Sequence, residues 1–485
     1  MNTYIGIDLG TSSVKLLLVG ADGRILNAVT KEYPVFYPRS GWSEQNPKDW
    51  LNATVCGMDE LLDGHRREDV KGLSFGGQMH GLVMLDDKDE VIRPAILWND
   101  GRTQKQTDEL NTVLGKATLS QYTSNIAFAG FTAPKILWVQ ENEPENFAKI
   151  AKIMLPKDYL AYMLTGAHVT DYSDASGMLL LDVQNKRWSN EMCAYCSVDE
   201  KWLPKLCESY ERIGTVRDEY DLPNAIVTAG AGDNAAAAIG TGTVCGGDCN
   251  ISLGTSGTVF IAQDTFSVDE NNALHSFAHA NGKYHLMGCI LSAASCNKWW
   301  SEEILGTKDY GAEQGGLDEW LGKNDVFFLP YLMGERSPHN DVSARGAFIG
   351  MRPDTTRKQM TLAVMEGVAF ALRDCVEVAK KSGLKIDKTK ICGGGAKSGV
   401  WKKIIANVFG IPVSTLSVEE GPAYGAAILA MVGTKEYKDV AAATVAIVKT
   451  KETVLPDERL TAAYEEKYSV FKQAYPALKG IFAQI

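Results

Sequence analysis

The sequence lacks any excess of positive charge and any apolar run long enough to cross a bilayer. Its 49 lysines and arginines are outnumbered by 60 aspartates and glutamates, which gives a formal net charge of −11. Nucleic acids and anionic membranes both require basic patches, so neither is expected as the main partner. With 485 residues the chain is too long for a single hydrophobic core, and two or more domains are expected.

Paired cysteines and a secretory leader are also missing. Ten cysteines are scattered along the chain, and only Cys193 and Cys196 form a close C-x-x-C pair. This pair has no second pair at zinc spacing, which indicates two buried thiols on one helical turn. Met1 is followed at once by a predicted strand, without a basic and apolar leader. The sequence therefore predicts free thiols in a reducing, cytoplasmic compartment.

The stretch around which the chain is organised is residues 5–15, Ile-Gly-Ile-Asp-Leu-Gly-Thr-Ser-Ser-Val-Lys. Its pattern predicts a strand, a tight turn rich in hydroxyl and N–H groups, and a second strand. Such a turn can hold a phosphate, and Asp8 beside it would repel that phosphate unless a cation such as Mg²⁺ lay between them. An ordinary hairpin with Asp8 in an Asx turn explains this stretch equally well when it is taken alone.

The same pattern returns halfway along the chain. Residues 251–256 (Ile-Ser-Leu-Gly-Thr-Ser) repeat residues 7–12 (Ile-Asp-Leu-Gly-Thr-Ser), with a serine in place of the aspartate. The repeat predicts two similarly built α/β halves, residues 1–247 and 248–485, each of which opens with a strand–turn–strand unit. Two facing phosphate turns with one carboxylate between them would form a nucleotide clamp in a cleft between the halves.

Two loops at predicted strand ends carry side chains suited to a small polar substrate. Residues 76–81 (Gly-Gly-Gln-Met-His-Gly) follow a predicted strand over residues 70–75, and open α/β sheets bind ligands at such ends. His80 in this loop is either a ligand-binding or a structural histidine. Asp233 follows the predicted strand 226–229 and opens an Ala-rich helix, so it is suited to act as a general base or simply as an N-cap.

Two further polar groups favour structural roles. His275 and His279 have the i, i+4 spacing of a metal-binding pair, but the residues around them predict strands, on which this spacing does not converge on one ion. Residues 171–177 faintly resemble a calcium loop in the wrong register, which predicts a helix-capping role for Asp174.

In the second half, a glycine-rich loop is the most informative element. Residues 393–398 (Gly-Gly-Gly-Ala-Lys-Ser) follow a predicted strand, and a base or phosphate can lie against such bare backbone, although a plain glycine turn is equally open. Apolar residues recur every three or four positions over residues 359–381, which predicts a long amphipathic helix. Residues 201–206 predict a short helix in the first half.

These motifs, in this order, resemble the FGGY carbohydrate kinases of the sugar kinase/Hsp70/actin superfamily. The resemblance extends from Met1 to about residue 433 and points to the bacterial xylulokinase branch of that family. The motifs that carry the family are residues 8–11, 252–255, 230–234 and 393–398. Those that carry the branch are residues 77–81, 96–102, 155–159, 292–296 and 329–336.

The resemblance implies two ribonuclease-H-like α/β domains with a cleft between them, and transfer of a phosphoryl group from ATP, with Mg²⁺, to D-xylulose. The implied residues of the sugar and metal sites are Asp233 as general base, Asp8 with Asp233 at the metal, and Met79, His80, Asp233 and Asn234 around the ketose. The implied nucleotide-binding residues are Thr11, Thr255, Trp299, Gly395 and Ala396. Gly399 departs from relatives with an asparagine there, which leaves its contact to the adenosine open.

Other functions remain open from the sequence. Another pentulose or polyol kinase, such as a ribulokinase, would share these motifs. An actin- or Hsp70-like ATPase switch would share the phosphate turns but has no need of the loop that holds Met79 and His80. The expected partners are a small sugar and ATP, and a homodimer is compatible with the resemblance.

Overall fold

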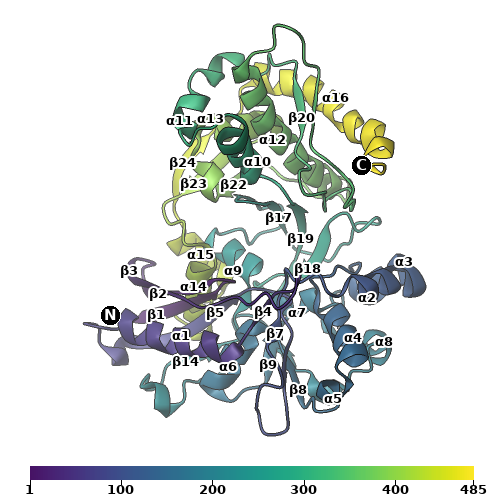
Figure 1. Ribbon diagram of the computed structural model, residues 1–485. Helices are drawn as coiled ribbons and strands as arrows, with labels where there is room; N and C mark the ends of the chain where they lie inside the picture. The colour runs from purple at the N-terminus through teal and green to yellow at the C-terminus, as the bar shows by residue number, and fades with distance from the viewer.

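The computed structural model describes residues 1–485 and contains two lobes, each built on one mixed seven-stranded sheet (Figure 1). The N-terminal sheet has the order β13–β14–β5–β1–β2–β3, and the short β15 also pairs with β5. Its strands are β1 (Thr3–Leu9), β2 (Ser13–Gly20), β3 (Ile25–Glu32), β5 (Val70–Gly77), β13 (Arg212–Thr215), β14 (Ile226–Thr228) and β15 (Ala231–Gly232).

The C-terminal sheet has the order β18–β19–β17–β16–β22–β23–β24. Its strands are β16 (Cys249–Leu253), β17 (Gly257–Gln263), β18 (His275–Ala278), β19 (Tyr284–Ile290), β22 (Thr389–Cys392), β23 (Val413–Leu416) and β24 (Thr450–Val454). β16 pairs antiparallel with β17 and parallel with β22, just as β1 pairs antiparallel with β2 and parallel with β5. The predicted fold class, two similarly built α/β halves, is confirmed.

The sheets are covered by helices whose bounds follow the sequence signals closely. The helices of the first half are α1 (Pro47–Leu61), α2 (Gln104–Glu109), α3 (Lys116–Thr123), α4 (Thr132–Asn142), α5 (Pro144–Phe147), α6 (Pro156–Thr165), α7 (Tyr172–Ala175), α8 (Asn190–Tyr195) and α9 (Asp233–Gly240). Those of the second half are α10 (Ala294–Trp299), α11 (Tyr310–Gln314), α12 (Arg357–Lys381), α13 (Gly399–Phe409), α14 (Gly421–Gly433), α15 (Val440–Ile447) and α16 (Glu458–Phe482). None of them is long and apolar enough to cross a lipid bilayer.

Short strand pairs complete the structure: β4 (Glu44–Gln45) with β7 (Ala95–Ile96), β6 (Val83–Leu85) with β8 (Lys152–Met154), β9 (Val169–Asp171) with β12 (Lys205–Cys207), β10 (Leu181–Asp182) with β11 (Arg187–Trp188), and β20 (Phe327–Leu329) with β21 (Ala347–Ile349). The helix predicted over residues 201–206 is therefore wrong. Pro204 lies in that segment and cannot continue a helix, and the chain instead enters β12.

Strand β1 shows how the N-terminal lobe is layered. Ile5, Ile7 and Leu9 pack in one core with residues of α1, whereas Tyr4 packs in another with residues of α9 and α14. This period-2 alternation is that of a strand covered on both faces. The first strand is therefore fixed between two helical layers, and its end provides a rigid base for the turn that follows.

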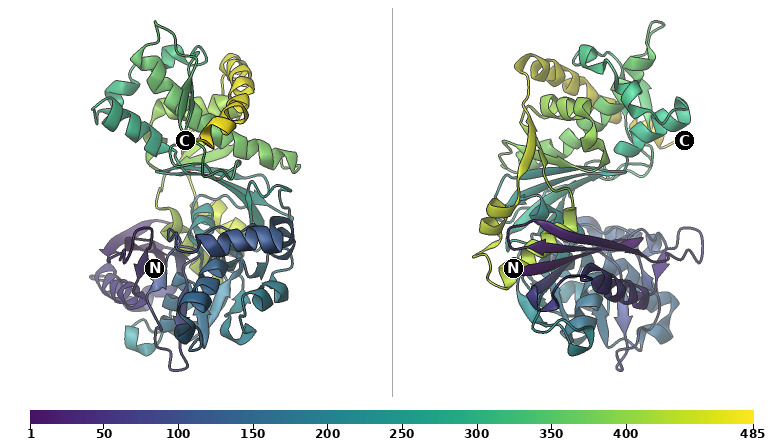
Figure 2. Two further views of the ribbon diagram at one scale, coloured as in Figure 1. Left: turned by 45° about the vertical axis from the view of Figure 1, so that its right-hand side comes forward. Right: turned by 90° about the vertical axis from the view of Figure 1, so that its left-hand side faces the viewer.

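Helix α14 comes late in the chain but lies on the N-terminal sheet (Figure 2). A Cβ on Gly6 of β1 would lie 1.8 Å from the Ala423 carbonyl oxygen, and one on Gly425 would lie 1.8 Å from the Ala236 carbonyl oxygen of α9. No side chain fits at either position, so glycine is required for this close packing. Helix α14, which belongs to the second half of the chain, thus forms part of the helical layer on the sheet of the first half.

Edge strand β18 joins the lobes on another side. The Asn125 side chain donates to the Ser276 carbonyl oxygen (2.9 Å) and accepts from the Ser276 N–H (3.2 Å). The Ser176 hydroxyl accepts from the Ala278 N–H (3.0 Å). Side chains of the first half thus satisfy and cover the backbone at the sheet edge of the second, which would otherwise be open to pairing with another chain.

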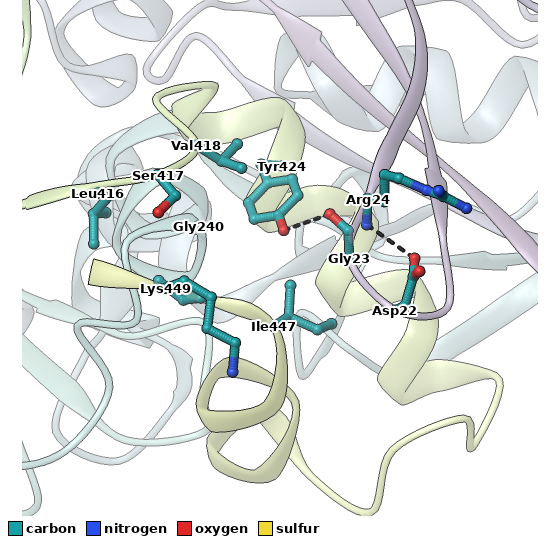
Figure 3. Close-up of a pocket in the computed structure, with 11 residues that line it drawn as sticks. Asp22, Gly23, Arg24, Gly240, Leu416, Ser417, Val418, Tyr424, Ile447 and Lys449 are labelled. Atoms are coloured by element: carbon teal, nitrogen blue, oxygen red, sulfur yellow. Dashed lines mark hydrogen bonds between the residues drawn. The ribbon is translucent and has the colours of Figure 1, made fainter. Parts of the chain in front are cut away.

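Figure 3 shows a pocket of about 200 Å³ where the β2–β3 turn meets the ends of β23 and α15. The Tyr424 hydroxyl donates to the Gly23 carbonyl oxygen across it (2.7 Å). None of the residues predicted for the functional site lines this pocket.

Candidate active site

The carboxyl ends of β1, β5 and β15 meet at one edge of the N-terminal sheet. Asp8 pairs with Gly76, and Gly76 pairs on its other side with Ala231. Neighbouring strands lie about 4.8 Å apart, so the end of β1 and the start of α9, which begins at Asp233, are close together. The structure thus brings together the two carboxylates that the sequence singled out, Asp8 and Asp233.

The electrostatics of this pair differ from those of surface carboxylates. Both side chains retain some accessible surface, but the surrounding protein removes most of their hydration. Burial raises the pKa of Asp8 to about 7, with the charge of Asp233 adding to the rise and Lys15 opposing it. Burial raises the pKa of Asp233 to about 6, opposed by its hydrogen bonds from Asn234. A cation at this place would relieve both costs.

The structural alternatives for these two residues fail. The Asp8 carboxylate accepts no hydrogen bond from its turn, so it does not form an Asx turn. The N-cap of α9 is Gly232, and the Asp233 carboxylate binds only the N–H (2.7 Å) and side-chain amide (2.8 Å) of Asn234, both through Oδ1. The Oδ2 atom of Asp233 is therefore free to accept a proton or to face a cation.

The donor set at this edge fits Mg²⁺. This ion prefers hard oxygen ligands and usually keeps several waters, so one or two carboxylates are enough to hold it. Asp8 and Asp233 supply two such groups, and no cluster of three or more metal-ligating side chains exists anywhere in the chain. His275 and His279 are both buried, and the Nε2 atom of His279 lies 2.9 Å from the Thr243 carbonyl oxygen.

His80 lies in the loop after β5 in a conformation fixed by its neighbours. Its φ of 69° is in the left-handed region, and its carbonyl oxygen accepts from the Lys135 ammonium (2.9 Å) and the Thr132 hydroxyl (3.1 Å). The imidazole stacks on Phe131 with ring centroids 4.5 Å apart. Strained backbone of this kind persists where the surroundings over-determine it, which is common at ligand sites.

The protonation state of His80 follows from its contacts. Its Nδ1 lies 2.8 Å from the Gly177 carbonyl oxygen, which can only accept, so Nδ1 carries the proton. Burial, together with the charges of Lys135 and Arg336, lowers the pKa of His80 to about 3, against the opposing effect of the hydrogen bond to Gly177. The ring is therefore neutral, and its Nε2, which has no protein partner, is an acceptor for a hydroxyl group. Met79 beside it packs on Gly232, so that loop adjoins the residue before Asp233.

The first Gly-Thr-Ser turn, residues 10–12, is held by side chains of other segments. The Thr11 hydroxyl accepts from the Trp98 indole N–H (2.9 Å), and the Thr11 carbonyl oxygen accepts from the Gln45 amide (2.7 Å). The Tyr33 hydroxyl donates to the Gly10 carbonyl oxygen (2.5 Å). The Gln78 amide donates to the same Gln45 side chain (3.0 Å), so one glutamine links the turn to the His80 loop.

The second turn is held through its own backbone, by N–H and hydroxyl donors from the start of α10 and the residue before it. The Thr255 carbonyl oxygen accepts from the Ala293 N–H (2.9 Å) and the Ser295 hydroxyl (2.7 Å), and the Thr255 side chain is exposed. Ser252 pairs with Cys392, the last residue of β22. The glycine-rich loop after β22 therefore lies beside this turn.

The remaining predicted nucleotide residues are partly covered. Gly395 and Ala396 are buried, and a Cβ on Gly395 would lie 2.5 Å from the Leu253 side chain. Gly394 before them has open space around its Cα. Trp299 is half-buried and stacks on Phe328 with centroids 6.1 Å apart. The structure thus groups Thr255 with the glycine loop, and Asp8, Thr11, Met79, His80, Asp233 and Asn234 in the other lobe.

A buried charge cluster beneath the Asp233 loop was missed from the sequence. The Lys157 ammonium lies 2.6 Å from Asp158, 2.9 Å from Asp171 and 3.6 Å from Asp174, and all four side chains are buried. The capping role predicted for Asp174 is wrong: Asp171 caps α7, and Asp174 faces Lys157 instead. The adjacent Lys157 and Asp158 in residues 155–159 could have indicated a charged site, but the two further carboxylates are brought to it only by tertiary folding.

This cluster reaches the candidate base through one serine. The Ser173 hydroxyl donates to Asp171 (2.5 Å) and accepts from the Gly232 N–H (3.2 Å). Burial raises the pKa of Asp174 well above its usual value, against the attraction of Lys157, and Asp158, Asp171 and Asp233 add to the rise. The peptide before Asp233 is therefore anchored to a fixed ionic core.

Comparisons with known proteins agree with this geometry. The family models described as "FGGY family of carbohydrate kinases", N-terminal and C-terminal domains, match residues 3–240 and 249–434. The chain is 39% identical to the xylulose kinase of Escherichia coli, over 99% of this chain and 100% of that protein. It is 40% identical to the xylulose kinase of Lactococcus lactis, over 100% of this chain and 99% of that protein.

Solved structures lead to the same conclusion. A crystal structure from Brucella ovis described as a xyloylose kinase is 40% identical, with a TM-score of 0.94 over 99% of this chain and 100% of that one. The Plasmodium falciparum glycerol kinase, 22% identical with a TM-score of 0.90 over 98% of each chain, shares the fold. Because the family models and full-length relatives match almost the entire chain, the protein belongs to the FGGY family of carbohydrate kinases.

Proposed function

We propose that this enzyme transfers the γ-phosphoryl group of ATP to a terminal hydroxyl of D-xylulose, forming D-xylulose 5-phosphate. The observation that carries this proposal is the convergence of Asp8 and Asp233 beside the loop of Met79 and His80. Relatives that are 39–40% identical over essentially the whole chain and are named xylulose kinase support the choice of sugar.

In this proposal the N-terminal half, residues 1–247, binds the sugar. Asp233 accepts the proton of the attacking hydroxyl through its free Oδ2 atom. His80 accepts a hydrogen bond from a sugar hydroxyl at Nε2, while Met79 and Asn234 border the ketose. General-base assistance contributes about 10²- to 10⁴-fold to such reactions.

The C-terminal half, residues 248–485, binds the nucleotide. The Thr11 and Thr255 turns face the phosphates from either side, and Trp299, Gly395 and Ala396 border the adenosine. Asp8 and Asp233 would hold Mg²⁺, which would neutralise charge on the phosphates. Because the transition state of phosphoryl transfer is loose, positioning and electrostatics provide most of the rate enhancement. The ten free cysteines are consistent with work in a reducing compartment such as the cytoplasm.

The test is ADP release in a coupled assay with D-xylulose, L-xylulose, D-ribulose, L-ribulose, xylitol or no sugar. We expect D-xylulose to give the highest kcat/KM and the sugar-free rate to be negligible. A higher value for ribulose would identify a different pentulose kinase, and sugar-independent turnover would indicate an ATPase switch. The Asp233→Asn variant serves as the control for background hydrolysis.

A further inference from the structure

Arg336 has a guanidinium group without any partner. It follows β20 in the C-terminal half, is half-buried, and makes no ion pair and no side-chain hydrogen bond. Its Cζ lies 5.0 Å from the centroid of Phe128, which belongs to the other lobe. A half-buried arginine with five free donors is unusual, because each of these N–H groups requires an acceptor.

The backbone of Arg336 is firmly held. The buried Glu335 carboxylate accepts from the N–H groups of Leu291 (2.9 Å) and Arg336 (2.7 Å). The Arg336 carbonyl oxygen accepts from the Asn340 N–H (2.6 Å), and the Ser337 N–H donates to the Cys289 carbonyl oxygen (3.0 Å). The side chain is therefore presented from a rigid support at the end of β19, as binding residues usually are.

Aromatic rings connect the Arg336 side chain to the His80 loop (residues 76–81). The ring of Phe128, which the guanidinium overlies, lies 5.5 Å from Phe131, on which the His80 ring stacks at 4.5 Å. The charge of Arg336 contributes to the low pKa of His80. Arg336 thus lies near His80, where the two halves of the chain meet.

We propose that Arg336 binds the keto end of the ketose, donating hydrogen bonds to its carbonyl and neighbouring hydroxyl oxygens. This inference rests on the proposed function. If the terminal hydroxyl lies at Asp233, an extended ketose places its carbonyl end on the opposite side of His80, where Arg336 is. A guanidinium only donates, and its planar fork suits two adjacent oxygen acceptors.

The sugar then contacts both halves of the chain. Met79, His80 and Asp233 belong to the first half, and Arg336 belongs to the second. Arg336 therefore contributes to selection of a ketose over the corresponding alditol. A carbonyl oxygen only accepts hydrogen bonds, whereas the alditol hydroxyl in its place must also direct its own O–H to an acceptor, which a guanidinium does not provide.

The test compares Arg336→Met with Arg336→Lys and with Arg345→Met. Methionine keeps an apolar stem over Phe128 but removes the donors, and Arg345 is a control because its guanidinium binds carbonyl oxygens of its own segment. We expect Arg336→Met to raise KM for D-xylulose at least tenfold and to change KM for ATP and the Ki of xylitol less than threefold. Arg336→Lys should fall between it and the wild type, and Arg345→Met should match the wild type.

A folded Arg336→Met variant whose KM for D-xylulose is within twofold of wild type would overturn the inference. So would equal losses for D-xylulose and xylitol, or an equal rise in KM for ATP. If Arg336→Met does not fold, the Arg336→Lys values decide by the same limits. If the wild type prefers another ketose, the proposed substrate is wrong. The same comparison of Arg336→Met with the wild type is then made with that ketose and its alditol. If turnover needs no sugar, calorimetric ketose binding to wild type and Arg336→Met decides, and equal affinities overturn the inference.

Discussion

The turns at residues 10–12 and 254–256 have the same strand pairing but different surroundings. At the first turn, the Thr11 hydroxyl binds Trp98, and its carbonyl oxygen binds Gln45. At the second, only the Thr255 backbone is bound, and the side chain is exposed. Asp8 at the end of β1 is matched by Ser252 at the same register of β16. The duplicated topology therefore carries a carboxylate at the end of the first strand in one half, and a serine followed by an exposed threonine in the other.

This difference follows from what each turn adjoins. Gln45 links the first turn to Gln78, which belongs to the His80 loop (residues 76–81). The turn and the loop are therefore fixed relative to each other. The second turn is bound by residues at the start of α10 and has no side-chain link to the His80 loop. Under the proposed function, the first turn would be preorganised beside the acceptor and the second would be open to nucleotide exchange, as in an enzyme whose domains close at each turnover.

The largest asymmetry is expected at Asp233. Replacing it by Asn should lower kcat about 10²- to 10⁴-fold, because the acceptor hydroxyl loses its base, while ATP affinity changes little. Thr255→Ala in the other lobe should instead raise KM for ATP with a smaller effect on kcat. Steady-state kinetics with both substrates measure the two values. Near-normal kcat in Asp233→Asn would show that its carboxylate does not act as the base.

Exchanging the residues that distinguish the turns sharpens the comparison. Asp8→Ser gives the first turn the residue of the second, and should lower kcat about tenfold or more and weaken the dependence on Mg²⁺, since one oxygen ligand is lost. Ser252→Asp introduces a carboxylate next to the phosphates without a second one to share a cation, so it should raise KM for ATP. Mg²⁺ titrations of both variants provide the measurement. An unchanged Mg²⁺ requirement in Asp8→Ser would remove Asp8 from the metal site.

The two lobes also contain ion pairs that differ in burial. Lys157 in the first lobe is the single cation among three buried carboxylates. Lys157→Met should destabilise the lobe by about 3–5 kcal/mol, because breaking a buried ion pair leaves charges without compensation. Lys403→Met in the second lobe removes an exposed pair with Asp318 and should cost about 1 kcal/mol or less. Urea unfolding of both variants measures the difference, and equal costs would mean that the cluster is already neutral.

The sequence predicted the parts of this architecture that depend on local pattern. The repeat at residues 251–256 predicted the duplicated sheets, and the spacing of apolar residues predicted α12, whose Thr356 and Gln359 form a capping box. The helix predicted over residues 201–206 was wrong because Pro204 and the pairing of β12 with β9 outweighed a weak helical pattern. The domain division at residue 247 remains a prediction, and α14 shows that packing crosses it.

The side chains that support the site were not predictable in the same way. Phe131, the N-cap of α4, and Lys135 within that helix both contact the loop of His80. They lie more than 50 residues away from it in the sequence. Asp174 resembled a cap because its loop is rich in short polar residues, and only folding places it against Lys157. Local spacing identifies residues that meet a ligand, but the residues that orient them are chosen by tertiary contact.

The smallest expected effect concerns a carboxyl group buried in the second lobe. Glu366 on α12 accepts from the Tyr464 hydroxyl (2.8 Å) and the Asn324 amide (3.2 Å), and burial raises its pKa to about 7, against these hydrogen bonds and Lys467. The folded protein therefore binds this proton more tightly than the unfolded chain, whose glutamates titrate near 4.5. The stability that Glu366 contributes is complete below pH 4.5 and is lost as pH rises through 7.

Glu366→Gln keeps the shape of the protonated acid and does not titrate. Its Tm should therefore lie at or below that of wild type at pH 5.5 and gain on it by a few degrees by pH 8.5, because only the wild type pays for ionisation there. Melting curves of both proteins across this range give the measurement. Tyr464→Phe is the control, since it removes a donor that favours the ionised form and should enlarge the loss at high pH. A constant difference in Tm between Glu366→Gln and wild type would mean that the carboxylate is ionised throughout, stabilised by Tyr464, Asn324 and Lys467.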